Sequence, residues 1–163
     1  MLEDLPGGLE GLRVCIEDFH AEGVKVLLPY NPWDQGTRNV GIPDYEKLVD
    51  QIVISNADGF NGDVLDGVNK TYWDEGIKRN HPIVMEPEVL MSNYSYLSYN
   101  AMSWGYWTPG ARDLVAPYVA MYKAVTQGRH LHHITERWAQ QHEDGIQQAF
   151  FNGAGFESWE NVW

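Results

Sequence analysis

The chain has 163 residues, of which 44% are hydrophobic, so it is long enough for one domain with a sizeable core and is not disordered by composition. Its formal charge of −12 argues against nucleic acid and anionic membrane surfaces as partners. A single cysteine, Cys15, excludes an intrachain disulfide framework and any metal site built from several cysteines.

The first part of the sequence predicts a helix followed by a strand. Apolar side chains over residues 4–22 recur three or four positions apart, which places them on one helical face. Gly23 is suited to end this helix. Residues 24–30 are mostly apolar, as in a buried parallel strand, and lead into a polar and aromatic loop over residues 31–38.

Two further helix–strand pairs follow. A helix is predicted over residues 44–55, with Pro43 at its start, and a strand over residues 57–63. A shorter helix over residues 71–78 precedes a strand over residues 81–88. Both strands run into glycine, proline and acidic residues, which are typical of sharp strand exits.

The second half of the sequence is less regular. Residues 100–107 predict a fourth strand. Apolar residues that recur from Leu131 to Ile146 predict a long helix over residues 131–148. A fifth strand is expected over residues 149–157.

Strands that alternate with helices predict an α/β fold made of parallel β/α units. No glycine-rich phosphate loop follows any strand, and polar residues end several successive strands, which favours the mouth of a barrel over an open doubly wound sheet. A complete barrel has eight units and about 250 residues. We therefore expect residues 1–163 to form one partial (β/α)8 TIM-type barrel that lacks N-terminal and C-terminal units. Its unpaired sheet edges would favour association with other chains.

Four segments of the sequence resemble a group of glycoside-hydrolase-like (β/α)8 proteins of bacteria. They are residues 27–34, 57–63, 86–88 and 151–163, and the run Gly155-Phe156-Glu157-Ser158-Trp159-Glu160-Asn161-Val162-Trp163 is the most specific. The group is similar in plan to the retaining α-galactosidase and α-glucosidase barrels, in which an aspartate at the end of the fourth strand is the nucleophile. The resemblance implies that Asp63 matches this aspartate by its place in the strand order, and it does not identify the acid/base residue.

Glycoside hydrolysis requires two carboxyl groups across the scissile bond, one to protonate the leaving oxygen and one to attack the anomeric carbon or activate water. Carboxyl groups follow most of the predicted strands. They belong to Asp34, Asp63, Asp66, Glu86, Glu88, Glu157 and Glu160. We predict Asp63 as the nucleophile or base, and Glu86 or Glu157 as the acid.

Other polar and aromatic residues near the strand ends are candidates for substrate binding. Indole rings can stack on the C–H faces of a sugar, amides both donate to and accept from hydroxyls, and further charged groups would line the same mouth. These candidates are Asn31, Trp33, Asp34, Trp104, Trp107, Arg129, His130, Asn152 and Trp159. Some of these candidates and of the carboxyl groups above have a structural alternative. A tryptophan is more often a core residue, Asp66 and Glu160 suit the first turn of a helix, and Glu88 suits a solvated position.

The histidines between residues 130 and 133 do not have the spacing of a metal site. On the predicted helix, His132 and His133 would point about 100° apart. We therefore expect neither a metal nor another cofactor.

Three functions remain open from the sequence. The first is a carbohydrate-active hydrolase acting on a carbohydrate or glycoconjugate, the second a non-catalytic carbohydrate-binding or structural module, and the third a metal-dependent hydrolase. The first requires Asp63 and at least one of Glu86 and Glu157 to meet at one rim.

Overall fold

A computed structural model of residues 1–163 shows the fold. It describes residues 2–33, 41–63, 68–88, 94–107, 131–137 and 155–159, and the single positions 124, 127, 146, 147 and 150. No helix of the described residues is long and apolar enough to cross a membrane.

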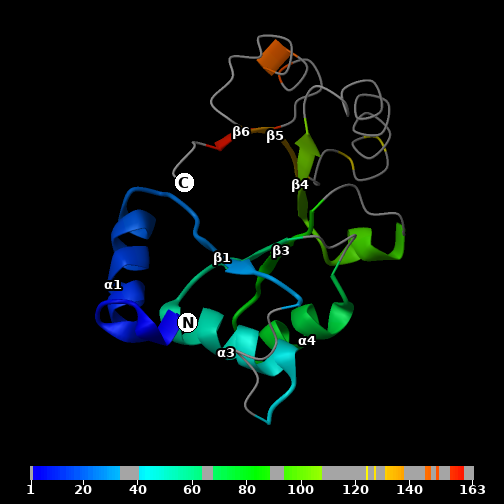
Figure 1. The fold of residues 1–163 in the computed structure, drawn as a ribbon. Helices are drawn as coiled ribbons and strands as arrows, with labels where there is room; N and C mark the ends of the chain where they lie inside the picture. The colour runs from blue at the N-terminus through cyan, green and yellow to red at the C-terminus, as the bar shows by residue number, and fades with distance from the viewer. Residues whose placement is uncertain are drawn as a thin grey trace.

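Six parallel strands form the framework of the described residues. They are β1 (Leu27–Tyr30), β2 (Gly59–Gly62), β3 (Val84–Glu86), β4 (Met102–Trp107), β5 (Leu131–Arg137) and β6 (Gly155–Trp159). Strands β1, β2 and β3 form one sheet in that order, and β4, β5 and β6 form a second. A parallel bridge between Glu88 and Trp104 connects the end of β3 to β4. The strands follow one another in an arc (Figure 1), and within the described residues the arc does not close into a barrel.

Three α-helices lie close to their predicted positions. They are α1 (Gly8–Ala21), α3 (Asp44–Ser55) and α4 (Lys70–Lys78). Two short 3-10 helices, η1 (Leu2–Asp4) and η2 (Tyr94–Ser98), were not predicted from the sequence. The stop at Gly23 is confirmed, because its φ is +78° and its N–H donates to the His20 carbonyl at 2.9 Å. The N–H of Val24 donates to the Phe19 carbonyl at 3.0 Å, which completes a Schellman motif.

The hydrophobic core lies between the first sheet and its helices. The in-register residues Leu28, Phe60 and Met85 are 3%, 0% and 0% exposed, and they belong to the same cluster as the buried face of α3. Figure 1 shows α3 and α4 on one side of this sheet. The α/β fold with parallel strands and alternating helices is thus confirmed. Because strand side chains alternate, residues 29, 61 and 86 belong to the opposite face.

A hydrogen-bonded chain joins the end of β1 to both helices. The hydroxyl of Tyr72 on α4 lies 2.6 Å from that of Tyr30, which donates to Asp44 at the start of α3 at 2.6 Å. Burial and these hydrogen bonds hold the pKa of Tyr30 far above its ordinary value, so the phenol remains a donor. These side-chain hydrogen bonds hold α3 and α4 against β1.

The helix predicted over residues 131–148 is wrong at its start, where the structure has β5. Leu131 and Ile134 are spaced as on a helix, but the segment pairs with β4 on one side and β6 on the other. Its β-branched Ile134 and Thr135 suit a strand, and pairing on both edges outweighs the apparent helical period. The strand expected over residues 149–157 is observed in part, as β6, which begins at Gly155, whereas Phe150 is helical.

Asp58, the residue before β2, ties three elements together at the amino end of the sheet. Its carboxylate accepts hydrogen bonds from Lys25 Nζ at 2.8 Å and the Val26 N–H at 2.9 Å, and lies 2.8 Å from Nε2 of His20 on α1. Burial raises the pKa of the Asp58 carboxyl, but the hydrogen bonds from Lys25, Val26 and His20 outweigh burial and hold that pKa below its ordinary value.

Replacing Asp58 with asparagine is expected to lower the free energy of unfolding by about 1–2 kcal/mol at pH 7. Because the folded pKa is depressed, the carboxylate contributes fully above its unfolded pKa of about 3.9, and this contribution is lost as the pH falls through the folded pKa. The difference in the free energy of unfolding between wild type and Asp58→Asn, measured by urea unfolding, should therefore be smaller at pH 3 than at pH 7. Asp18→Asn, at an exposed position of α1, is the control. An equal difference between wild type and Asp58→Asn at both pH values would contradict the prediction.

Candidate functional site

The carboxyl ends of β2 and β3 bring two polar side chains together. Asn61 and Glu86 are partners in the parallel register, and Asn61 Nδ2 donates to Glu86 Oε2 at 3.1 Å. Glu86 is only 4% exposed, whereas Asn61 is half-buried. Both lie on the sheet face opposite the helix-facing core, because their neighbours Phe60 and Met85 belong to that core. The first predicted acid is therefore a buried carboxyl, oriented by an amide.

Close approach of the two backbones sets this register. Two positions before Asn61 and Glu86, Gly59 pairs with Val84. A Cβ on Gly59 would lie 1.9 Å from the Val84 carbonyl oxygen, so only glycine fits there. Gly59 thus determines how closely β2 meets β3.

Asp63 is the first residue after β2 and is half-buried. Its N–H donates to the Tyr30 carbonyl at the end of β1, at 2.9 Å. It lies two positions beyond Asn61, the neighbour of Glu86, and on regular strand geometry the Cα atoms of Asp63 and Glu86 would be about 8 Å apart. The structure therefore brings the predicted Asp63 and Glu86 to the carboxyl ends of adjacent strands.

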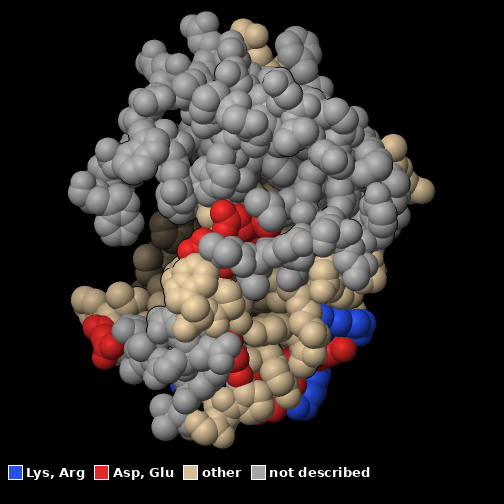
Figure 2. Space-filling model, turned by 45° about the vertical axis from the view of Figure 1, so that its right-hand side comes forward, with Lys and Arg blue, Asp and Glu red and all other residues tan. Residues whose placement is uncertain are grey.

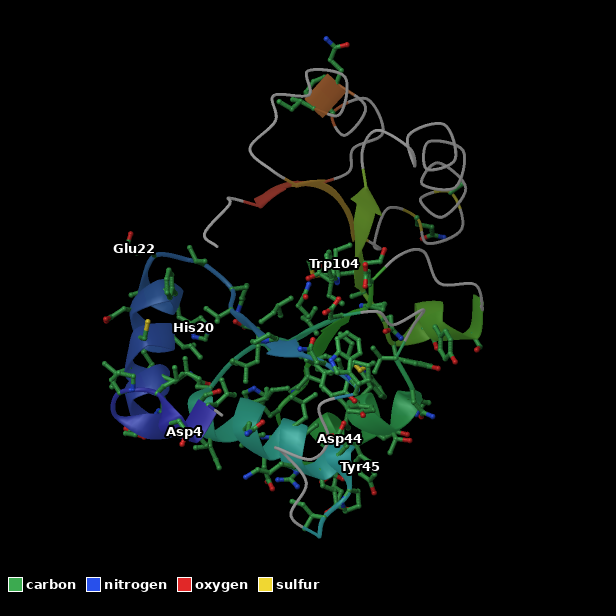
Figure 3. The ribbon with its side chains drawn as sticks, in the orientation of Figure 1. Asp4, His20, Glu22, Asp44, Tyr45 and Trp104 are labelled. Carbon is green, nitrogen blue, oxygen red and sulfur yellow. The ribbon has the colours of Figure 1, made fainter. Side chains whose placement is uncertain are left out.

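Trp104 and Glu88 close the other side of this site. Trp104 is 1% exposed, and its indole N–H donates to the Gly62 carbonyl at 3.0 Å. Because β3 separates β2 from β4, the indole extends across the end of β3. Glu88, the bridge partner of Trp104, is 9% exposed rather than solvated. Figure 3 shows Trp104 on the side of the first sheet opposite Asp44 and Tyr45. Trp104 is buried, so its ring packs across the strand ends and does not present a surface platform.

Asn31 and Trp33 follow β1 at the same end of the sheet. Asn31 is half-buried, and Trp33 is 59% exposed. Among the described side chains, Trp33 is thus the one predicted stacking residue whose indole ring is exposed.

The charges at this end of the sheet are acidic. Among the side chains that the structure describes, every Lys and Arg lies on or next to a helix or at the amino end of β1. They are Arg13, Lys25, Lys47, Lys70, Lys78 and Arg79. Figure 2 shows Asp and Glu in the middle of the visible face and also at its left edge and lower right, with most of the visible Lys and Arg at the right-hand side. The site thus offers carboxylates and amides, which suit hydroxyl groups and a developing positive charge.

The remaining predicted residues are not described at the level of side chains. Trp107 lies in β4, and Glu157 and Trp159 lie in β6, and only their backbone is described. Glu157 is in register with Thr135 of β5, within the strand rather than beyond it. Asp34, Asp66, Arg129, His130, Asn152 and Glu160 fall outside the described residues.

Metal binding has no support in the described part of the chain. No group of three or more His, Cys, Asp or Glu side chains there is arranged to hold an ion. Two histidine side chains are described: His20 contacts Asp58, and Nε2 of His81 lies 2.7 Å from the Ala57 carbonyl oxygen. Both are at the amino end of the sheet, away from Glu86.

Asn61 is the functional candidate that the sequence reasoning missed. The signal was available in the alternation of strand side chains: Asn61 stands two positions before Asp63, so both lie on one face of an extended strand. What the sequence lacked was the register that sets Asn61 beside Glu86.

The described residues define an α/β protein whose parallel strands follow one another in chain order. Acidic side chains lie at the carboxyl ends of these strands. Comparison with protein-family models, curated proteins and solved structures finds no match to this chain.

Proposed function

We propose that the chain is a carbohydrate-active hydrolase domain that cleaves a glycosidic bond with paired carboxylates, Asp63 and Glu86, on a partial (β/α)8 TIM-type barrel. The barrel is supported by the order of the strands, because consecutive parallel strands stay adjacent in a barrel, whereas an open doubly wound sheet reverses order at its switch point. Ligands of such barrels bind at the carboxyl ends of the strands.

The observation that carries the proposal is the Glu86 carboxyl, 4% exposed at the end of β3 and hydrogen-bonded to Asn61. A general acid must be oriented toward the leaving oxygen and kept from bulk water, and burial with an amide partner serves both needs. Glu86 therefore takes the role of acid, ahead of Glu157.

Asp63 takes the complementary role of nucleophile or base. It is more accessible than Glu86 and lies at the end of the adjacent strand, so both carboxyl groups stand at one rim, where they can flank one glycosidic bond. Trp33, exposed after β1, is suited to stack on a sugar ring. Asn31, next to it, can bond hydroxyls.

Purified full chain should hydrolyse at least one member of a panel of aryl glycosides, and Asp63→Asn should lower kcat by about 10²–10⁴-fold. Asp18→Asn, an exposed carboxylate on α1, is the control and should retain activity. Circular dichroism checks that each variant is folded. Equal turnover by wild type and Asp63→Asn would exclude Asp63 as a catalytic residue, and binding of oligosaccharides without hydrolysis would favour a non-catalytic module.

A further inference from the structure

The connection from β2 to α4 is anchored at both of its described ends by one short stretch of chain. At the β2 end, the Trp104 indole N–H donates to the Gly62 carbonyl at 3.0 Å. At the α4 end, Asn100 Oδ1 accepts from the Val68 N–H and Asn100 Nδ2 donates to the Val68 carbonyl, each at 3.3 Å. Asn100 lies two residues before β4 and Trp104 lies within β4, and Asp63 directly follows the first anchor point, Gly62.

The two anchoring side chains are buried, so the loss of their hydrogen bonds would not be compensated by water. Asn100 is 0% exposed and Trp104 is 1% exposed. A buried backbone carbonyl or N–H that loses its partner bears its full desolvation cost, whereas the same loss at the surface is largely compensated by water. Asn100 also donates to the Tyr96 carbonyl at 3.2 Å, so the amide joins η2 to the start of α4.

We propose that Trp104 and Asn100 are positioning residues, which hold the segment after β2 so that Asp63 stays in place beside β3. The chemical consequence rests on the proposed function, in which Asp63 takes part in bond cleavage. The anchoring itself is a property of the folded chain and can be measured without a substrate. Strand ends on which catalytic groups stand need such support, because a displacement of about 1 Å can cost 10²-fold in rate.

The test compares three variants of the full chain by hydrogen exchange and by 15N–1H NMR. Trp104→Phe keeps an aromatic ring but removes the indole N–H, and Asn100→Ala removes both bonds to Val68. The matched control is Trp73→Phe on α4, which makes the same chemical change at a half-buried ring that contacts Lys70 at 5.1 Å.

Trp104→Phe and Asn100→Ala should each raise exchange in the peptide over residues 62–68 by about tenfold, because about 1.4 kcal/mol changes an equilibrium constant tenfold. The Asp63 amide signal should shift in both variants. Exchange in α3 should stay unchanged, and Trp73→Phe should leave the peptide and the Asp63 signal as in wild type.

Unchanged exchange over residues 62–68 would overturn the proposal. An equal rise in exchange throughout the chain would also overturn it, because the two residues would then support only global stability. A rise in exchange confined to residues 62–68 without a shift of the Asp63 amide signal would overturn it as well. Failure of the proposed function is seen separately, as undiminished turnover by Asp63→Asn. That result would remove the positioning role even if the anchoring were observed.

Discussion

Replacing Gly59 with alanine is expected to lower the free energy of unfolding by at least about 3 kcal/mol, the largest effect of any single methyl group among the positions discussed. The added Cβ would lie 1.9 Å from the Val84 carbonyl oxygen and 2.7 Å from the Val84 carbonyl carbon. These are backbone atoms of β3, so the clash cannot be relieved by moving a side chain. The two strands would have to separate, which would break the ladder on which Asn61 and Glu86 face each other.

Urea unfolding of the full chain measures this loss, with Gly23→Ala as control. Gly23 has a φ of +78° but no atom within 4 Å of an added Cβ, so that variant bears only the cost of a left-handed backbone, about 1–2 kcal/mol. If Gly59→Ala were no less stable than Gly23→Ala, the close approach of β2 and β3 would not be needed for folding.

The second large effect concerns activity. Replacing Glu86 with glutamine should lower kcat by about 10²–10⁴-fold on any glycoside that the wild type hydrolyses, because the amide cannot donate the carboxyl proton. Stability should change by less than about 1 kcal/mol, since glutamine has the same shape and its carbonyl can still accept from Asn61. Steady-state kinetics measures kcat, and urea unfolding of the same preparation measures stability.

Glu75→Gln is the matched control, because Glu75 is also a buried glutamate, 6% exposed, but on α4. Its carboxylate accepts from Arg79 Nε at 2.7 Å and from Lys78 Nζ at 3.0 Å, and the bond from Arg79 holds the pKa of Glu75 below its ordinary value. That variant should lose stability at neutral pH and keep full activity. The opposite pattern, with Glu86→Gln unstable and active, would show Glu86 to be structural.

The contrast between these two glutamates explains what the sequence could predict of the site. Glu75 lies inside a periodic helix with Arg79 four positions later, so an ion pair is expected from spacing alone. Glu86 stands where a strand ends, so the sequence predicts that it lies at the carboxyl end of the sheet but does not predict its hydrogen-bond partner. The hydrogen bond from Asn61 depends on the register of β2 against β3, and that register follows from the contact between Gly59 and Val84.

The helical prediction over residues 131–148 was wrong in β5 for a similar reason. A short run with apolar residues three apart fits a helix, and only the presence of β4 and β6 on both sides makes it a strand. Likewise, the sequence left two roles open for Trp104, a core residue or a stacking platform, with the core favoured. The structure decides for the core, because Trp104 is 1% exposed and its indole nitrogen lies 3.0 Å from the Gly62 carbonyl oxygen.

The sequence by itself determined the local elements: α3 over Asp44–Ser55, the stop of α1 at Gly23, and the apolar strands that alternate with helices. These follow from periodicity and from backbone preferences, which act between residues near in the chain. The tertiary structure alone decided which strand ends adjoin, which acid is buried and which residues bond to Gly62 and Val68. Those outcomes depend on contacts between residues far apart in the sequence, whose geometry is fixed only when the strands pack.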